Sequence, residues 1–239
     1  MSDLSAVKAL VFDVFGTVVD WRTSLINDFT KWSKTRGVAA DWTALVDGWR
    51  AVYTASMDQV RKNPQGGYII LDVLHRRSLE KLVEQLSIKG LTDADLHYLT
   101  MGWHRLYPWP DSVAGLTRLK TKYIISPLSN GNVALLTNMA KFSGLPWDLI
   151  MSAELFEHYK PDRETYLGAA KLLCLPPEQV MMVAAHNNDL KAAQSHGLKT
   201  AFVARPTEYG PLQKRDFEAN GDWDIVAKDF GGVADRLGC

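Results

Sequence analysis

The chain has 239 residues, 46% of them hydrophobic, and its 27 Lys and Arg residues balance its 27 Asp and Glu residues. This neutral balance excludes the strongly basic surface that binds nucleic acid or an anionic membrane. No apolar run approaches the roughly 20 residues of a membrane helix, the N-terminus lacks a signal-peptide pattern, and two cysteines make no disulfide framework. We therefore expect a cytoplasmic protein, built as one large domain or as a core with a smaller insertion.

The first predicted element is a strand over residues 9–12, where an apolar run stops at Asp13. A short run without helical period is typical of a strand buried on both faces of a sheet. Gly16 permits a tight turn behind the strand, and the Thr17 hydroxyl can bond to the backbone of that turn. An Asp at the carboxyl end of such a strand lies where open α/β sheets bind ligands, so Asp13 is a candidate nucleophile or metal ligand. An Asp that merely starts the turn fits this stretch equally well.

Residues 20–105 have a different character and are predicted to be helical. Apolar residues recur at helical spacing, for example Leu45, Trp49 and Val52, with polar residues between them. The sequence NPQGG at residues 63–67 interrupts the pattern, and Thr92 with Asp95 is typical of a helix start. Because no pattern here is typical of a buried strand, this segment is predicted to be a helical insertion.

Strands and helices alternate after residue 106. The patterns predict strands at residues 123–128, 149–151, 180–185 and 201–203, an edge strand at 225–226, and helices at 112–121, 135–142, 164–173 and 191–196. Such alternation is typical of an α/β fold with a doubly wound parallel sheet. We therefore assign residues 1–19 and 106–239 to an α/β core domain and residues 20–105 to an inserted helical cap domain.

Polar side chains follow several of these strands. Ser and Asn at residues 129–130 follow the second predicted strand, and His-Asn-Asn-Asp at residues 186–189 follows the fourth. Lys160 precedes a proline, which restricts the conformation of the preceding residue and so gives the lysine a defined direction. Because the carboxyl ends of parallel strands meet at one edge of a sheet, these groups are predicted to converge with Asp13.

This order of groups resembles the haloacid dehalogenase superfamily, and the resemblance covers essentially the whole chain. It extends to one member class, the L-2-haloacid dehalogenases, through Trp49-Arg50 and residues 129–131, 159–162 with Tyr166, 186–190 and 205–210. Phosphatases of the superfamily carry a second Asp two residues after the nucleophile, which protonates the leaving alcohol, whereas this chain has Phe15 there. Halide is the anion of a strong acid and leaves without a proton, so the resemblance implies a dehalogenase.

The resemblance implies a hydrolase that converts short-chain L-2-haloalkanoic acids, with haloacetates and fluoroacetate as further candidates, into 2-hydroxy acids and halide. Asp13 would displace the halide and carry the acid as an ester until water hydrolyses it. Lys160 would keep Asp13 ionised, and Asp189 would orient Lys160 or activate the water. Thr17 would steady the nucleophile or bond only the turn. Tyr166 would bond in the Lys160 network or only pack on its helix.

The same resemblance assigns the groups that hold the substrate. Ser129 and Asn130 are expected to bind its carboxylate, with Ser129 also counted in the catalytic set. Arg50 of the cap is expected to face the halide, a task that Asn130 shares, because a guanidinium stays charged and offers several donors. Phe15 is expected in the apolar wall around the carbon–halogen bond. His186 stands where many members of the class have Asn, so it either assists ester hydrolysis or bonds the neighbouring loop.

The resemblance implies no metal ion or other cofactor, and it implies a homodimer. The expected partner is a small halogenated carboxylic acid, not nucleic acid or a membrane. The alternative is a metal-dependent phosphatase of the same superfamily, which would need Mg²⁺ beside Asp13 and Asp189. A binding protein without activity is disfavoured, because it has no reason to keep the nucleophile. The sequence gives neither the halogen preference nor the chain length of the acid.

Overall fold

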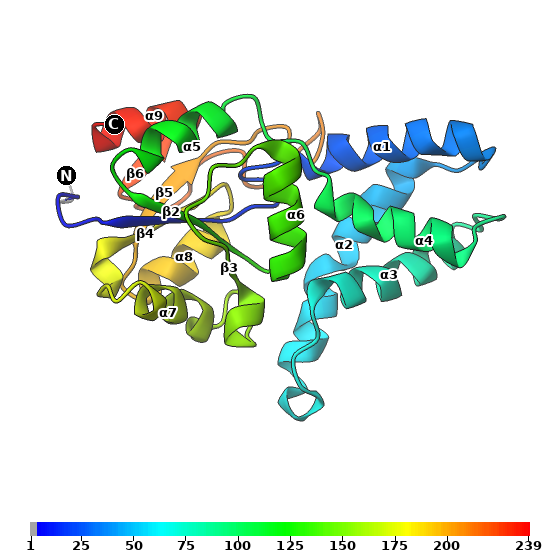
Figure 1. The fold of residues 1–239 in the computed structure, drawn as a ribbon, viewed down its shortest axis with the longest axis horizontal. Coiled ribbons are helices and arrows are strands. Elements are labelled where there is room, and N and C mark those ends of the chain that lie inside the picture. Colours follow the sequence, from blue (N-terminus) through cyan, green and yellow to red (C-terminus); the bar gives the residue numbers. More distant parts are fainter. Residues whose placement is uncertain (1–3) are drawn as a thin grey trace.

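The computed structural model describes residues 4–239, so the first three residues of the predicted core range 1–19 lie outside the described part. A six-stranded sheet runs in the order β3-β2-β1-β4-β5-β6, and its neighbouring strands pair in parallel (Figure 1). The predicted α/β fold with a parallel sheet is therefore confirmed. The strands are β1 (Ala9–Phe12), β2 (Ile124–Ser129), β3 (Met151–Ser152), β4 (Val180–Ala184), β5 (Lys199–Val203) and β6 (Ile225–Ala227).

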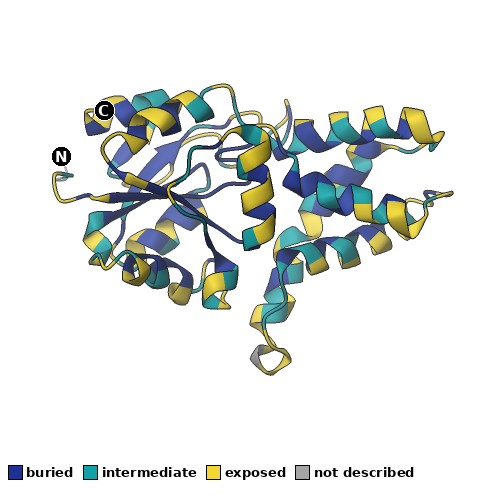
Figure 2. Cartoon of the chain, in the orientation of Figure 1, coloured by how far each residue is buried: buried dark blue, intermediate teal, exposed yellow. Residues whose placement is uncertain are grey.

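The central strand β1 is buried on both faces of the sheet. Its side chains alternate between two apolar cores, with Leu10 and Phe12 in one and Val11 in the other. Figure 1 shows α5 and α9 above the sheet and α7 and α8 below it, and Figure 2 shows that the strands between them are largely buried. This cover on both faces is the predicted doubly wound arrangement. The helices are α5 (Ser112–Lys120), α6 (Val133–Ser143) and α9 (Phe230–Leu237) on the first core and α7 (Arg163–Leu172) and α8 (Asn187–Ser195) on the second.

The chain between β1 and α5 is helical, as predicted, and no strand interrupts residues 21–105, which all lie in the described part. Thr92 and Asp95 form the predicted reciprocal N-cap of the last of its longer helices. None of the helices within residues 4–239 is both long and apolar enough to cross a membrane. In Figure 1 these helices stand together beside the sheet. They are α1 (Trp21–Arg36), α2 (Trp42–Arg61), α3 (Leu71–Gln85) and α4 (Asp93–Thr100), with short 3-10 turns η1 (Pro64–Gly66) and η2 (Met101–His104).

Two helices differ most from the prediction, and several other elements differ by one or two residues at their ends. Helix α8 begins at Asn187, not at residue 191, so Asp189 belongs to its first turn and not to a loop. Asn and Asp are common both in turns and at helix starts, and the sequence pattern did not separate the two cases. Helix α9 was not predicted, because its two glycines lower its helix propensity; it forms where its apolar face packs on α5. Strand β3 begins at Met151 instead of residue 149. Helix α6 and strand β5 begin two residues earlier than predicted.

The strand order defines the ligand-binding edge of the sheet. Strands β1, β2 and β3 run to one side and β4, β5 and β6 to the other, so the order reverses between β1 and β4. Asp13 directly follows β1, and His186 lies two residues after β4. Open α/β sheets bind ligands in the crevice beyond the carboxyl ends of their strands at such a reversal. The fold therefore brings these two side chains to the expected position of a functional site.

Candidate active site

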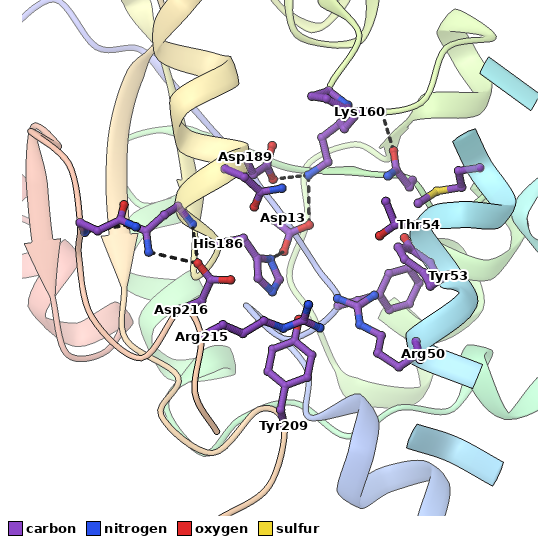
Figure 3. A pocket seen from close by; sticks show the side chains of 18 of the residues that line it. Asp13, Arg50, Tyr53, Thr54, Lys160, His186, Asp189, Tyr209, Arg215 and Asp216 are labelled. Atoms are coloured by element: carbon purple, nitrogen blue, oxygen red, sulfur yellow. Dashed lines mark hydrogen bonds and ion pairs between the residues drawn. The ribbon is translucent and has the colours of Figure 1, made fainter. Parts of the chain in front are cut away.

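A cavity of about 420 Å³ lies where helix α2 meets the carboxyl edge of the sheet. Figure 3 shows side chains from both parts pointing into it. Most of the residues that the sequence singled out line this cavity, and Thr17 lies directly behind the first of them. The predicted convergence of distant segments on one site is therefore present in the structure. The lining residues named from the sequence are Asp13, Phe15, Arg50, Asn130, Lys160, Tyr166, His186 and Asp189.

Asp13 is bonded at both carboxylate oxygens. Lys160 Nζ lies 3.0 Å from Oδ1, Thr17 Oγ1 donates to Oδ2 at 2.8 Å, and His186 Nδ1 lies 2.9 Å from the same Oδ2. Burial disfavours the charge of Asp13, but Lys160 and His186 outweigh it and hold the pKa of this carboxyl well below its usual range. Thr17 is itself fixed, because the backbone N–H of Ala185 donates to its hydroxyl at 2.9 Å. Asp13 is thus an ionised carboxylate with a fixed orientation.

Lys160 lies between two carboxylates, 3.0 Å from Asp13 and 2.5 Å from Asp189 Oδ2. Burial opposes the charge of the ammonium group, but the two carboxylates raise the pKa of Lys160 above its usual value. Tyr166 donates to the other oxygen of Asp189 at 2.6 Å, which forms the predicted network. Burial raises the pKa of Asp189. The backbone N–H of Lys160 donates to Asn130 Oδ1 at 2.8 Å, so the lysine is held at the sheet edge.

His186 has a carboxylate at each ring nitrogen. Nδ1 lies 2.9 Å from Asp13 Oδ2, and Nε2 lies 2.9 Å from Glu208 Oε2. Because an ionised carboxylate only accepts hydrogen bonds, both nitrogens must donate, and the ring is an imidazolium cation. Burial acts against this charge, but Glu208 and Asp13 raise the pKa of His186 well above its usual range. His186 therefore contacts both Asp13 and Glu208 of the neighbouring loop. The second contact is the loop bond that the sequence left open, and assistance to ester hydrolysis stays a prediction.

Glu208 is a site residue whose role was not predicted from the sequence, although it lies in the segment 205–210 that contributes to the family resemblance. It is 1% exposed, and Trp21 Nε1 donates to its carboxylate at 3.0 Å. Gly16 makes room for it: its φ is +92°, and a Cβ there would lie 2.2 Å from the carboxyl group of Glu208. Arg205 positions the segment, because its guanidinium donates to the carbonyl of Thr17 at 2.9 Å. The available sequence signal was Gly16, which permits a close approach without naming the partner.

Arg50 reaches the cavity from helix α2. Its guanidinium carbon lies 4.5 Å from the ring centroid of Tyr53 and 5.3 Å from that of Trp21, and Nη2 lies 3.5 Å from Glu208 Oε1. Burial opposes its charge, but Tyr209 and Glu208 raise the pKa of Arg50. Nη1 is buried and has no hydrogen-bond partner within the described residues. A buried, charged donor without a partner is suited to an anion.

Phe15 and Asn130 present different chemistry to the cavity. The Phe15 ring packs edge-on against Trp103 and Tyr53, with centroids 5.5 and 6.3 Å apart, and so forms an apolar wall. Asn130 lines the cavity, whereas Ser129 is completely buried behind it. The Ser129 hydroxyl accepts a hydrogen bond at 3.1 Å from the backbone N–H two residues further on. Ser129 therefore holds the loop from behind the cavity, where its side chain is not part of the lining as its expected contact with the substrate would require, whereas Asn130 is part of that lining.

The charged side chains form one chain of alternating sign. Successive nitrogen–oxygen distances along it lie between 2.5 and 3.5 Å. Opposite charges this close in a buried site hold each other in the ionised form. Asp13 is consequently charged before any ligand enters the site. In order, the chain runs through Asp189, Lys160, Asp13, His186, Glu208 and Arg50.

A sequence model of the haloacid dehalogenase-like hydrolase family matches residues 7–197, a range that includes Asp13, Lys160 and Asp189. The chain belongs to this family. The match confirms the superfamily that the order of motifs predicted.

This hydrolase is similar to solved L-2-haloacid dehalogenases over nearly its whole length. The L-2-haloacid dehalogenase PA0810 is 50% identical, with 97% of this chain and 99% of that chain covered and a TM-score of 0.92. The defluorinating L-2-haloacid dehalogenase Rha0230 is 44% identical, with 98% and 96% covered and a TM-score of 0.94. The (S)-2-haloacid dehalogenase of Xanthobacter autotrophicus is 28% identical over 83% of this chain and 76% of its own length. The predicted resemblance to this class is confirmed.

Proposed function

We propose that this hydrolase is an L-2-haloacid dehalogenase, which converts short-chain 2-haloalkanoic acids and water into 2-hydroxy acids and halide. The observation that carries the proposal is an ionised Asp13 with a fixed orientation, with Phe15 beside it. Phe15 occupies the position at which phosphatases of the superfamily carry an acid. Asp13 supplies a nucleophile, and halide needs no proton to leave. The 44% and 50% identity to L-2-haloacid dehalogenases supports the same activity.

The two oxygens of Asp13 differ in their partners, which assigns their roles. Among the described residues, Oδ1 accepts one side-chain hydrogen bond, from Lys160, whereas Oδ2 accepts two, from Thr17 and His186. Oδ1 has the freer lone pairs and attacks C2 of the substrate. The electron pair of the carbon–halogen bond leaves with the halide, and Oδ1 becomes the bridging oxygen of an ester. Attack from the side opposite the halide inverts C2 where that carbon is chiral.

Some of the groups around Asp13 would bind the departing halide, and others would contact the carbon chain of the substrate. Arg50 Nη1 is the buried donor without a partner among the described residues, and it receives the departing halide together with Asn130. Phe15 and Tyr53 supply the apolar surface beside the reacting carbon. A charged donor aimed at a leaving anion stabilises the charge that develops in the transition state.

Arg215 is a further candidate to bind the substrate carboxylate. Lys160, His186 and Arg50 each already contact one or two carboxylates of the protein. Arg215 lines the same cavity, where its guanidinium carbon lies 4.0 Å from the ring centroid of Tyr209, and among the described residues it forms no ion pair (Figure 3). An anionic substrate therefore finds an uncommitted positive charge in Arg215. The sequence gave no signal for it.

A single-turnover reaction in ¹⁸O-labelled water tests the proposed covalent route. With enzyme in excess over 2-chloropropionate, the lactate formed should contain no ¹⁸O at C2, because its new hydroxyl oxygen comes from Asp13 Oδ1. The label should instead enter Asp13, where mass spectrometry of the peptide containing it shows the gain. Label in the first lactate would mean that water attacks C2 directly, and absence of chloride release would reject the dehalogenase function itself.

The phosphatase alternative makes a different demand on the same site. Asp13 and Asp189 are the carboxylates that would lie beside Mg²⁺, and both already pair with the ammonium group of Lys160, at 3.0 and 2.5 Å. We therefore expect EDTA to leave chloride release from 2-chloropropionate unchanged, and Mg²⁺ to give no turnover of a phosphomonoester. Loss of chloride release in EDTA that Mg²⁺ restores would favour the phosphatase mechanism.

The domain organisation belongs to the same proposal. Arg50 and Tyr53 of α2 line the cavity, so we propose that residues 20–105 act as a cap domain over a core of residues 1–19 and 106–239. The cap would complete the halide pocket, and the core would supply the nucleophile. The homodimer, the cytoplasmic location and the covalent ester stay predictions.

A further inference from the structure

We propose that Thr17 and His186 form an oxyanion hole for hydrolysis of the Asp13 ester, and that Glu208 is the positioning residue that keeps His186 charged while the ester exists. This inference rests on the proposed dehalogenase function and concerns its second half-reaction. It gives a role to Glu208, which is not among the residues that line the cavity, and to the second carboxylate oxygen of Asp13.

Two hydrogen-bond donors already lie beside Asp13 Oδ2, the atom on which negative charge develops during hydrolysis of the ester. Thr17 Oγ1 lies 2.8 Å from Oδ2 and His186 Nδ1 lies 2.9 Å from it. Donors to an oxyanion act at about 2.7–3.1 Å from the position of that oxygen. When Oδ1 carries the substrate, Oδ2 is the carbonyl oxygen of the ester and becomes the oxyanion when water attacks Cγ. Both donors are in place before the reaction, so no side chain has to move.

Glu208 matters because the first half-reaction removes a charge. In the free enzyme two carboxylates stabilise the imidazolium of His186, namely Asp13 at Nδ1 and Glu208 at Nε2. Esterification makes Asp13 neutral, and Glu208 then remains as the carboxylate bonded to the ring. Glu208 is itself held in the ionised form, because Trp21 Nε1 donates to it and Arg50 Nη2 lies 3.5 Å away.

The other charged groups of the cavity do not replace Glu208. Three of them are cations, which act against a proton on His186, and Asp189 is engaged by Lys160 at 2.5 Å. Asp216 accepts from the backbone N–H and the side chain of Asn187, at 3.1 Å each. The charge on His186 in the ester intermediate therefore depends on Glu208. The charged groups that line the cavity with His186 are Asp13, Arg50, Lys160, Asp189, Arg215 and Asp216.

Water hydrolyses the Asp13 ester by addition followed by elimination. Water oxygen bonds to Cγ of Asp13, the carbonyl electron pair moves onto Oδ2, and a proton of the water passes to Asp189. The oxyanion then collapses, the bond between Cγ and Oδ1 breaks, and Oδ1 leaves with the product and takes the proton from Asp189. Asp13 now holds the water oxygen and loses the remaining proton to solvent. Over both half-reactions, one haloacid and one water give one hydroxy acid, one halide and one proton.

Glu208→Gln tests the proposal, because Gln keeps the shape and can still accept from Nε2 but has no charge. The variant should release one equivalent of chloride per site in a rapid burst, and then hydrolyse its ester about 100-fold more slowly than the wild type, the loss typical of one oxyanion donor. Intact-protein mass spectrometry should show the trapped ester on Asp13. Lowering the pH from 8 to 6 should speed hydrolysis in Glu208→Gln, because it protonates His186 again, and should not speed it in the wild type.

Two further variants keep the test decisive. His186→Gln replaces the cation with a neutral donor and should give the same burst, with slow hydrolysis that does not rise at lower pH. Glu80→Gln is the matched control: it makes the same change at a carboxylate that pairs with Arg76 at 2.7 Å but is 49% exposed and lies outside the cavity, so it should accumulate no ester.

Two outcomes would contradict the proposed roles, and they can be distinguished. If Glu208→Gln slows the burst and the steady state by the same factor, with no ester trapped and no recovery at pH 6, the residue acts only on structure and the proposal is wrong. If the wild type itself releases no chloride from 2-chloropropionate, it is the dehalogenase function that fails. The two failures are therefore separate observations.

Discussion

Asp13→Asn should reduce chloride release from 2-chloropropionate by at least about 10⁴-fold, the scale on which enzymes lose activity with their nucleophile. An amide has no negative charge and cannot displace a halide from carbon at a useful rate. The fold should persist, because Asn has the same shape and each neighbouring cation keeps one carboxylate: Lys160 keeps Asp189, and His186 keeps Glu208. Ion chromatography of halide and circular dichroism of the variant measure the two outcomes.

Asp235→Asn is the matched control for this experiment. Asp235 also pairs with a cation, Arg118 at 2.7 Å, but its side chain is 70% exposed and lies outside the cavity. The same chemical change there should leave halide release unaffected. Turnover retained by Asp13→Asn, after excluding hydrolysis of the new amide back to Asp by peptide mass spectrometry, would refute nucleophilic catalysis by Asp13.

Lys160→Met should damage both stability and activity. It leaves the carboxylates of Asp13 and Asp189 buried without the cation between them, and breaking a buried pair of this kind costs about 3–5 kcal/mol. With that cation gone, the pKa of Asp13 rises and the nucleophile takes up a proton more readily. We expect loss of most halide release at pH 7 and a lower urea midpoint.

A second substitution separates the two effects of Lys160. Adding Asp189→Asn to Lys160→Met removes the repulsion between the carboxylates, so it should restore part of the stability without restoring activity. Lys120→Met is the surface control: Lys120 pairs with Asp148 at 2.9 Å, but its side chain is 39% exposed, and such pairs contribute about 0–1 kcal/mol. Equal unfolding midpoints for Lys160→Met and Lys120→Met would contradict the buried ion-pair account.

Local sequence patterns determined the elements that surround the nucleophile. The strand at 9–12 was predicted from four apolar residues that stop at Asp13, and the structure has β1 at Ala9–Phe12. The helical insertion and the reciprocal cap of Thr92 and Asp95 were predicted from residues three or four positions apart. Such signals survive folding because the hydrogen bonds and the buried face that they describe lie within one element.

The convergence of Asp13, Lys160 and Asp189 was also predicted, although these residues are far apart in the chain. It followed from one general property, that parallel strands place their carboxyl ends at a common edge. The family resemblance then attached roles to positions, and Phe15 distinguished a halide from an alcohol as the leaving group. No pattern gave the strand order, helix α9 or the start of α8, because packing between distant elements decides them.

The sequence by itself therefore determined the position of the proposed nucleophile, the architecture around it and the proposed class of leaving group. Tertiary structure alone decided which charges meet. Trp21 and Glu208 are separated by 187 positions and His186 and Glu208 by 22, yet all three side chains join in one buried network. A carboxylate that pairs across such distances leaves no periodicity in the chain, since its partner is chosen by the approach of two loops and not by spacing. Gly16 is a local sign of that approach, because a side chain there would collide with Glu208. The sequence could not show which residue approaches Gly16, and the fold was needed to identify it.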